Sequence, residues 1–215
     1  PKDYFAKPLD IDLSINGSFG ELRYNHFHSG VDFSGNRKVG APIFATADGV
    51  VSRIQINEKG YGKAIYIKHP NGYTTVYGHL DSYNGAIQEY VLKYQYREEK
   101  YMIEAFPLKD ELIVKKGDII GFVGNTGSSG GPHLHYEIRD TQSEETINPF
   151  LFGVGDWIVD KEKPILNELL VYPISEFSYV NGSNVPILLS LTKQNDGNYV
   201  AETVKTNGTI GFGVN

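Results

Sequence analysis

Apolar and polar side chains alternate along much of the first 150 residues, and this pattern predicts short strands. The clearest runs are residues 48–56, 60–68 and 73–80, which are rich in β-branched and aromatic residues. Turn signals such as Asp48-Gly49 separate the runs. The pattern therefore predicts an antiparallel β-sheet meander of the all-β class, and the 15 Tyr and 11 Phe of the chain favour the same class.

The pattern also divides the chain into three predicted segments. Residues 1–18 are expected to form an N-terminal extended arm or edge strand, and residues 19–155 the main domain. Residues 156–215 hold a linker at Asp160–Pro164 and several short strands separated by turns. A complete β-sandwich takes roughly 100 residues, so this last segment is expected to be a partial β-sandwich-like module that is truncated.

A charged and aromatic insertion at about residues 84–112 interrupts the main predicted domain. Its pattern fits a helix or extended chain, and it is longer than a connecting loop needs to be. We expect this insertion to line one rim of a groove.

Charge and composition narrow the range of partners. The net charge is -6 and the basic residues are scattered, whereas nucleic acids and anionic membranes attract basic patches, so neither partner is expected.

No apolar run approaches the ~18 residues that cross a bilayer, so no transmembrane segment is expected. The chain starts at Pro1, which indicates that the natural N-terminus was removed. Because there is no cysteine, a metal site must use His, Asp and Glu.

The most informative stretch is a glycine-rich loop at residues 124–131 that leads into a strand. Alternation places His133, His135 and Glu137 on one face of that strand. Two imidazoles so placed suit a site in which one binds a metal ion and the other reaches its water. A half-exposed strand with polar residues outward fits the same pattern, and Glu137 is expected to face solvent, although it can also orient one of the histidines.

A second stretch pairs His28 with Asp32, and Gly30 between them favours a turn leading into a strand over a helix. The two side chains can close on one cation, or Asp32 can simply orient His28. His26 repeats the His-x-His spacing, so either His26 or His28 can face a metal ion.

Two further histidines stand near the ends of predicted strands. Alternation places His79 on the same face as Tyr77, provided that Gly78 does not bulge the strand. His79 can donate a proton to a reacting group, or pack as a strand-end imidazole. His69 precedes the Asn71-Gly72 turn and is expected to face solvent without a role.

Three motifs together resemble the lysostaphin-type, LytM-like zinc endopeptidases in order and spacing, over roughly residues 19–149. The motifs are His28-x3-Asp32, Tyr77-Gly-His79-Leu80 and Gly127-x3-Gly131-Pro-His133-Leu-His135. The resemblance implies the antiparallel fold of that family, a duplicated hybrid motif. It also implies that His28, Asp32 and His135 bind one Zn²⁺, which selects His28 over His26.

In the same way, the resemblance implies that His133 is the general base and that His79 stabilises the transition state or the leaving group, although the two roles can be exchanged. Two histidines and one carboxylate leave the fourth tetrahedral position of zinc for water, as in catalytic sites. Zinc lowers the pKa of such a water to about 7, so that it attacks the peptide carbonyl near neutral pH.

Members of this family cut peptide cross-links of bacterial peptidoglycan. The resemblance therefore implies a peptidoglycan peptide as substrate and an extracytoplasmic location, in the periplasm or cell envelope of a bacterium. Four side chains either line the substrate groove or pack in the sheet: Tyr66, Tyr73, Tyr77 and Asn125.

Two rival interpretations remain at this point. One is a non-catalytic or latent module of the cell envelope with the same fold, and the latent form requires Asn25 or His26 to fill the fourth zinc position. The other keeps zinc in a carrier-type or structural site, but the open fourth position and the two additional histidines argue against it.

Overall fold

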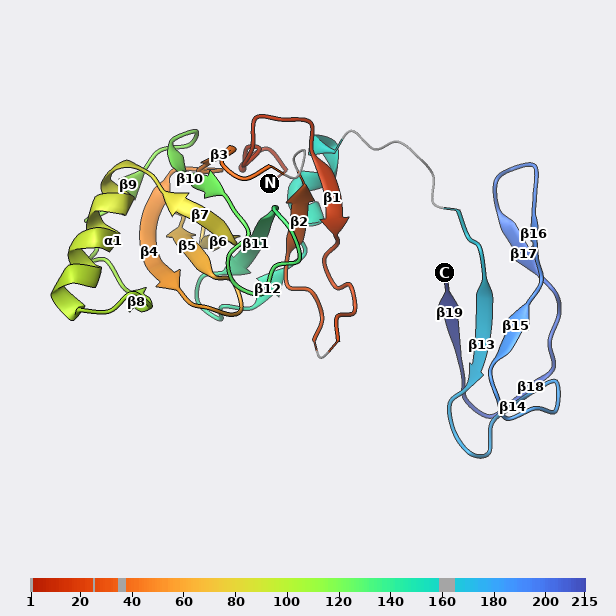
Figure 1. Ribbon diagram of the computed structural model, residues 1–215. Helices are drawn as coiled ribbons and strands as arrows, with labels where there is room; N and C mark the ends of the chain where they lie inside the picture. The colour runs from red at the N-terminus through yellow and green to blue at the C-terminus, as the bar shows by residue number, and fades with distance from the viewer. Residues whose placement is uncertain (1, 25, 35–37, 159–164) are drawn as a thin grey trace. The chain divides into compact units, whose positions relative to one another are not determined.

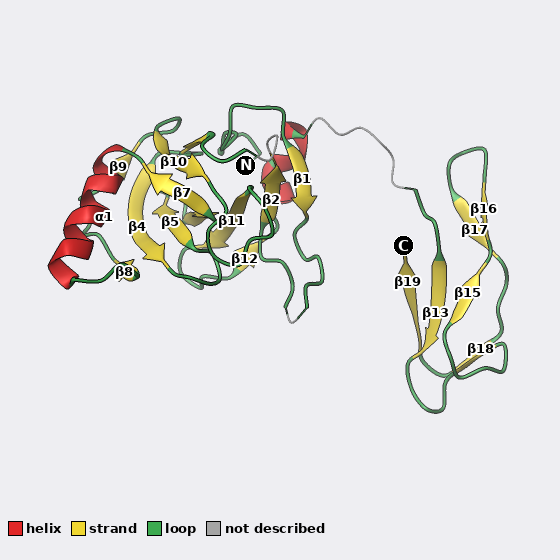
Figure 2. Ribbon diagram, viewed as in Figure 1, coloured by secondary structure: helices red, strands yellow, loops and turns green. Residues whose placement is uncertain are grey.

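The computed structural model describes residues 2–24, 26–34, 38–158 and 165–215, and the chain divides into two compact units, Pro1–Asp160 and Lys161–Asn215 (Figure 1). Antiparallel strands dominate both units (Figure 2), which confirms the all-β prediction. The predictions made for Pro1, Asn25 and the linker at Asp160–Pro164 fall outside the described residues.

One large antiparallel sheet forms the frame of the first unit. Its order is β1-β2-β11-β6-β5-β4-β8, with β12 paired to β11 and β9 paired to β4. The strands are β1 (Ser14–Gly17), β2 (Val31–Ser34), β4 (Gly49–Ile56), β5 (Lys63–Lys68), β6 (Tyr73–Gly78), β8 (Ile103–Ala105), β9 (Ile113–Val114), β11 (Leu134–Asp140) and β12 (Thr146–Ile147). Strand β11, which carries His135 and directly follows His133, is thus held between β2 and β6.

A smaller sheet covers one face of the large one. It has the order β3-β10-β7, formed by β3 (Pro42–Phe44), β10 (Ile119–Val123) and β7 (Leu80–Tyr83). The core cluster joins Ile120 of the small sheet to Tyr77 and Tyr136 of the large sheet, all three fully buried. Because side chains alternate along a strand, the neighbours of Tyr77 and Tyr136 point to the other face of the large sheet. That other face carries the polar side chains of β11.

The segments at the edges of the first unit also pack against this core. Residues 1–18, which were expected to form an extended arm, contribute Phe5, Leu9 and Leu13 to it and end in edge strand β1. The predicted insertion contains the helix α1 (Gly85–Glu98), which buries Ile87 and Val91. Two 3₁₀-helices follow the sheet: η1 (Pro149–Phe152) and η2 (Val154–Trp157). None of the described helices is long and apolar enough to cross a membrane.

The second unit consists of short strands around a small core. Its sheets have the orders β15-β13-β19, β14-β18 and β16-β17. The strands are β13 (Leu169–Pro173), β14 (Tyr179–Val180), β15 (Ile187–Leu189), β16 (Leu191–Lys193), β17 (Tyr199–Ala201), β18 (Thr206–Asn207) and β19 (Ile210–Val214). Val171, Val180 and Leu189 form its buried centre.

His69 is buried, so the expectation that it faces solvent is wrong. Its Nδ1–H donates to the carbonyl oxygen of Asp48 at 2.8 Å, and its Nε2 lies 2.7 Å from Oγ1 of Thr75. The ring also packs edge-on against Phe5, with the ring centroids 5.4 Å apart. The N-terminal segment therefore covers this imidazole, and burial lowers its pKa.

This burial predicts that His69 makes the first unit less stable in acid. The unfolded chain protonates His69 below about pH 6.5 while the folded chain does not, so the free energy of unfolding falls as the pH drops through that range. We expect the loss of urea resistance between pH 7 and pH 5.5 to be smaller in His69→Gln than in the wild type, although the variant is less stable at pH 7. An equal loss in both proteins would contradict this prediction.

Candidate metal centre

The sheet register brings the predicted metal ligands together. Asp32 of β2 lies directly opposite His135 of β11, and such cross-strand pairs have neighbouring side chains on one face. His28 approaches from the loop that precedes β2. A Cβ at Gly30 would collide with the carbonyl oxygen of Tyr136, so glycine lets this loop pass close to β11. The glycine between His28 and Asp32 is therefore needed for close approach.

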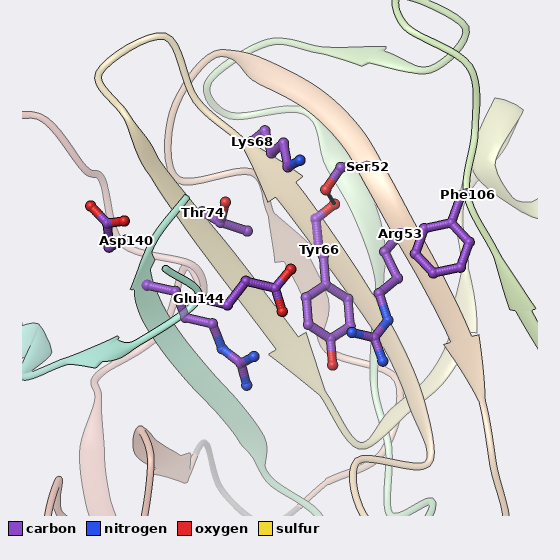
Figure 3. A pocket seen from close by; sticks show the side chains of 9 residues that line it. Ser52, Arg53, Tyr66, Lys68, Thr74, Phe106, Asp140 and Glu144 are labelled. Carbon is purple, nitrogen blue, oxygen red and sulfur yellow. Dashed lines mark hydrogen bonds between the residues drawn. The ribbon is translucent and has the colours of Figure 1, made fainter. Parts of the chain in front are cut away.

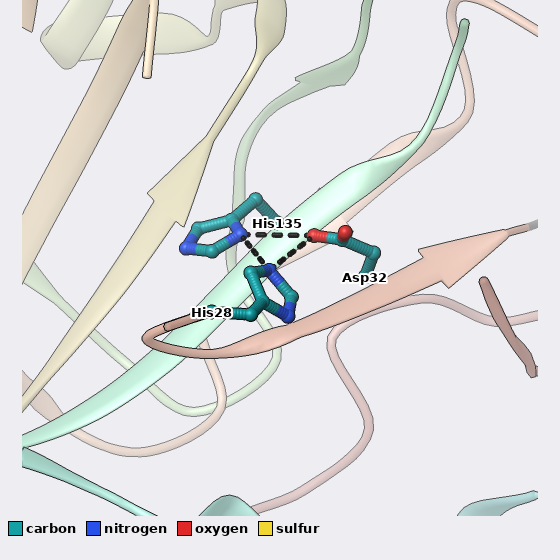
Figure 4. Close-up of side chains that lie close together, drawn as sticks. All are labelled: His28, Asp32 and His135. Atoms are coloured by element: carbon teal, nitrogen blue, oxygen red, sulfur yellow. Dashed lines mark hydrogen bonds and ion pairs between the residues drawn. The ribbon is translucent and has the colours of Figure 1, made fainter. Parts of the chain in front are cut away.

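The three side chains converge on one point (Figure 4). Nε2 of His28 lies 3.0 Å from Oδ1 of Asp32 and 3.0 Å from Nδ1 of His135, and the latter two atoms are 2.9 Å apart. All three residues are buried. Ligand atoms about 2.0–2.1 Å from a tetrahedral zinc ion are about 3.3 Å from one another. The triangle is thus close to one face of such a tetrahedron.

Hydrogen bonds on the far side of each imidazole fix which nitrogen carries the proton. Nδ1–H of His28 donates to the carbonyl oxygen of Ser18 at 2.9 Å, and Nε2–H of His135 donates to Oε1 of Glu137 at 2.8 Å. The neutral rings therefore turn lone pairs toward Oδ1 of Asp32. Three lone pairs at this separation repel one another unless a cation lies between them, so the donor set fits a metal ion.

The pKa shifts of Asp32 and His135 indicate that the cluster binds a positive charge. Burial alone would raise the pKa of Asp32, but the imidazoles of His133, His135 and His28, any of which donates to the carboxylate when it takes up a second proton, hold the pKa well below its usual range. Burial alone would lower the pKa of His135, but its hydrogen bonds to Asp32 and Glu137 raise it to about 9. Without a metal ion, a proton on His135 supplies the positive charge.

Glu137 does not face solvent, which corrects the favoured expectation for this residue. Its side chain is fully buried, and Oε1 accepts hydrogen bonds from Tyr61 Oη at 2.6 Å and Ser29 Oγ at 2.5 Å, besides that from His135. Oε2 accepts from Nε of Arg139 at 2.6 Å. Burial opposes ionisation, but His135 and Arg139 lower the pKa of Glu137 to about 2. Glu137 is therefore an anion that orients His135.

Removing this charge is expected to weaken metal binding. The variant Glu137→Gln keeps a hydrogen-bond acceptor but loses the negative charge behind His135, and loss of such a partner typically costs about 10- to 100-fold in metal affinity. Competition with a chromophoric chelator measures the affinity. Glu145→Gln, an exposed position just beyond β11, serves as the control. Equal zinc affinity in the two variants would contradict the role of Glu137.

The second oxygen of Asp32 is also held in place. Oδ2 accepts a hydrogen bond from Nη2 of Arg23 at 3.0 Å. A Cβ at Gly17 would collide with both groups, so the glycine provides the room for this pair. Each of the three candidate ligands thus has an outer contact that fixes its orientation.

His79 lies on the face of the metal cluster, but Tyr77 lies in the core, so the prediction that they share a face is wrong. His79 adopts a left-handed backbone conformation with φ of 62°, between β6 and β7, and this conformation reverses the alternation. Its backbone N–H donates to the carbonyl oxygen of Tyr61 at 2.8 Å, and its Nδ1–H to that of Thr126 at 2.8 Å. Such unfavourable backbone geometry persists only where surrounding contacts hold it.

His133 lies between His79 and the metal cluster. The ring centroids of His133 and His79 are 4.7 Å apart, and Nε2 of His133 is 3.4 Å from Oδ1 of Asp32. Nδ1–H of His133 donates to the carbonyl oxygen of Gly131 at 2.8 Å. In the neutral ring, Nε2 is therefore a proton acceptor beside the cluster. The five residues to which the resemblance assigns a role thus meet in one place.

These residues line a cavity of about 610 Å³, a volume typical of ligand sites. Its lining is Arg23, Tyr24, His26, His28, Ser29, Asp32, Gly60, Tyr61, His79, Ser128, Gly130, His133 and His135. His26 reaches the cavity but is not part of the ligand triangle. The predicted groove residues Tyr66, Tyr73, Tyr77 and Asn125 do not line it, and neither does any residue of the insertion at 84–112.

Tyr61 and Arg23 are the main residues that sequence reasoning missed. Tyr61 stands between two glycines, Gly60 and Gly62, in the loop between β4 and β5, whereas the sequence pattern places it within the predicted strand run at residues 60–68. Arg139, which holds Glu137, is a third residue that sequence reasoning missed. It follows His135 and Glu137 at the same spacing of two, so the alternation that placed those two residues on one face also predicts Arg139 there.

Comparison with known proteins agrees with the resemblance. The model of Peptidase family M23 matches residues 26–96 and 95–149. The DD-carboxypeptidase/endopeptidase Mpg of Neisseria meningitidis serogroup B is 38% identical over 122 residues, which are 57% of this chain and 22% of Mpg. The peptidoglycan DD-endopeptidase ShyC of Vibrio cholerae is 37% identical over 142 residues, which are 63% of this chain and 27% of ShyC.

Among solved structures, a zinc containing peptidase from Vibrio cholerae matches with a TM-score of 0.50 and 25% identity, covering 67% of this chain and 39% of that one. The chain thus spans only about a quarter of the length of the curated relatives named above. The match of the family model nevertheless extends over more than half of the chain and includes every motif residue. The resemblance to the lysostaphin-type enzymes is thereby confirmed, and the chain belongs to peptidase family M23.

Proposed function

We propose that the chain is a zinc-dependent endopeptidase that hydrolyses peptide cross-links of bacterial peptidoglycan, with residues 19–155 as its peptidase domain. His28, Asp32 and His135 are the proposed ligands of one Zn²⁺. The observation that carries the proposal is the buried triangle of donor atoms, 2.9–3.0 Å apart, with Nε2 of His133 beside it. The names of the relatives Mpg and ShyC support the substrate class.

The catalytic work then divides between the metal and the histidines. When bound, zinc supplies Lewis-acid polarisation of a carbonyl and a water that ionises near neutral pH. His133 is the proposed general base, because Nδ1–H is fixed on Gly131 and Nε2 is left to accept a proton. The same Nε2 can return that proton to the leaving amine when the peptide bond breaks.

His79 is the proposed stabiliser of the transition state or the leaving group. Burial lowers its pKa to about 4, and the Thr126 carbonyl holds its Nδ1–H, so the resting imidazole has no proton at Nε2. Negative charge that develops beside the ring raises the pKa of the imidazole. His79 therefore becomes a donor only when its Nε2 takes up a proton from solvent as that charge develops, and it carries no such proton in the resting site.

The proposed substrate places the protein outside the cytoplasm, because peptidoglycan is extracytoplasmic. We propose the periplasm or the cell envelope of a bacterium as its location. The cavity beside the metal cluster is open to solvent through loops that carry Tyr24, Gly60 and Ser128, which suits a peptide within a larger polymer.

Elemental analysis combined with release of peptides from purified peptidoglycan tests the proposal. We expect one zinc per chain, release of cross-link peptides with new amino termini, loss of release after chelation, and recovery on addition of zinc. Zinc binding without peptide release would favour the non-catalytic or latent envelope module. A chain that binds no zinc would overturn the proposal.

A further inference from the structure

The glycine-rich loop at residues 124–131 holds both of the proposed catalytic histidines through its backbone carbonyl groups. Nδ1–H of His133 donates to the carbonyl oxygen of Gly131 at 2.8 Å. Nδ1–H of His79 donates to the carbonyl oxygen of Thr126, also at 2.8 Å. One loop thus keeps the proton of each neutral imidazole on Nδ1, which leaves Nε2 of each ring to take part in proton transfer.

The side chain of Thr126 anchors the part of the loop that holds His79. His79 and Thr126 are 47 positions apart in the chain, so their contact depends on how the loop is placed. Oγ1–H of Thr126 donates to the carbonyl oxygen of Leu80 at 2.9 Å, and Oγ1 accepts from the backbone N–H of Lys63 at 2.9 Å. Because Leu80 directly follows His79, one hydroxyl group ties the loop to the backbone beside this histidine and to the start of β5.

Glycines on both sides of Thr126 permit this close approach. A Cβ at Gly124 would collide with the backbone of Asp81, and a Cβ at Gly127 would collide with that of Gly62. Gly127 also has φ of 72°, a conformation that glycine adopts without strain. The glycines of the loop therefore bring Thr126 against the two segments to which its hydroxyl group binds.

The loop between β4 and β5 completes the support of His79. The backbone N–H of Gly60 donates to Oγ of Ser128 at 3.0 Å, and that of Ser128 donates to the carbonyl oxygen of Gly60 at 2.8 Å. The next residue, Tyr61, accepts the backbone N–H of His79. His79 is thus held by two loops that are also bonded to each other. Its left-handed backbone requires such contacts, because this conformation is unfavourable for a residue with a side chain.

The contact with Thr126 decides which nitrogen of His79 carries the proton. Nε2 of His79 forms no hydrogen bond within the part of the chain that the structure describes, so the carbonyl at Nδ1 alone selects the tautomer. A ring released from this carbonyl can turn or carry its proton on Nε2, and either change removes the proton acceptor from the site. Misplacement of a catalytic group by about 1 Å can cost about 10²-fold in rate.

We propose that Thr126 is a positioning residue for His79, whose hydroxyl group anchors the glycine-rich loop so that the loop carbonyl selects the tautomer and orientation of this imidazole. The assignment deepens the proposed peptidase function and rests on it for the role of His79 in cleavage. Thr126 does not line the cavity at the metal centre, so it acts through His79 and not on the peptide.

The variants Thr126→Val and Thr126→Ser test this role, because valine removes the hydroxyl group at nearly constant size and serine keeps it. We expect kcat for a cross-link peptide to fall about 10- to 100-fold in Thr126→Val while KM and zinc content are unchanged, and to stay near the wild-type value in Thr126→Ser. An unchanged kcat in Thr126→Val, or an equal loss in both variants, would overturn the assignment. If Thr126→Val does not fold, Thr126→Ala takes its place, since water can then reach the two backbone groups.

A double-mutant cycle shows whether Thr126 acts through His79. In the background of His79→Ala, the further substitution Thr126→Val should cost no more activity, because the side chain that Thr126 positions is gone. Losses that multiply in the double variant would mean that the two residues act independently, and the assignment would be wrong.

Thr141→Val provides a matched control. Oγ1 of Thr141 lies 2.8 Å from Oγ1 of Thr74, which belongs to β6, the strand that leads to His79. Thr74 lies in the wall of a separate cavity of about 60 Å³ (Figure 3), and no residue lines both this cavity and the one at the metal centre. We expect Thr141→Val to keep the kcat of the wild type. A loss equal to that of Thr126→Val would show that the effect is not specific to the loop.

Proton–nitrogen NMR spectra of protein labelled at histidine separate this assignment from the proposed activity, because they need no cleavage. The Nδ1–H signal of His79 is identified by its absence from His79→Gln. We expect the signal in the wild type and in Thr126→Ser but not in Thr126→Val, where the released N–H exchanges with water. This pattern supports the assignment even if no peptide is ever cleaved, in which case only the proposed activity fails. A signal of equal strength in Thr126→Val would overturn the assignment whatever the activity of the protein.

Discussion

Replacement of His133 by alanine is expected to slow peptide cleavage about 10²- to 10⁴-fold while one zinc ion per chain is retained, because the variant loses a general base but no ligand. The imidazole adjoins the ligand triangle, with Nε2 3.4 Å from Oδ1 of Asp32. Its removal enlarges the cavity that it lines. Single-turnover cleavage of a peptide and elemental analysis of the same sample measure both quantities.

Rescue by added imidazole distinguishes the loss of a base from a structural defect. A small base that diffuses into the vacated space should restore part of the rate in His133→Ala and leave the wild type unaffected. The variant should also keep the thermal unfolding midpoint of the zinc-bound wild type to within a few degrees. Full cleavage activity in His133→Ala, or loss of its zinc, would show that His133 is not the base.

The strands and the candidate ligands were largely predictable because both follow from spacing. Alternation over two residues places His135 and Glu137 on one face of β11, and His133, which immediately precedes the strand, follows the same alternation. The Gly30 turn between His28 and Asp32 leads into β2 for a similarly local reason. The two local motifs therefore locate the candidate ligands on and beside two adjacent strands, β2 and β11.

The residues that were misjudged depend on contacts between distant segments. Glu137 is buried because Tyr61 and Ser29, 76 and 108 residues away, close over it. His69 is buried because the N-terminal segment folds back and places Phe5 against its ring. His79 and Tyr77 lie on opposite faces because the backbone of His79 is left-handed. Nothing in the alternating run predicts a left-handed histidine. Burial of a polar side chain is thus a tertiary property that local pattern cannot supply.

Replacement of Asp32 by asparagine is expected to abolish zinc binding at micromolar metal and, with it, all cleavage above background. Asp32 is the only anion of the donor triangle, and its Oδ1 is shared by His28 and His135. Asparagine is nearly the same size but neutral, so the cation loses the charge that offsets its desolvation. Arg23, which pairs with Oδ2 and also with Glu21, would keep its positive charge beside the site after the carboxylate of Asp32 is lost.

The loss of zinc in Asp32→Asn should be visible in stability as well as in activity. A ligand present at 100 times its dissociation constant stabilises the folded state by about 2.7 kcal/mol, so added zinc should raise the unfolding midpoint of the wild type and leave that of Asp32→Asn unchanged. Asp10→Asn, an exposed position outside the site, should respond to zinc as the wild type does. Because stabilisation by zinc requires no substrate, this comparison tests the metal centre independently of the peptidase reaction. A zinc-dependent rise in Asp32→Asn equal to that of the wild type would remove Asp32 from the ligand set.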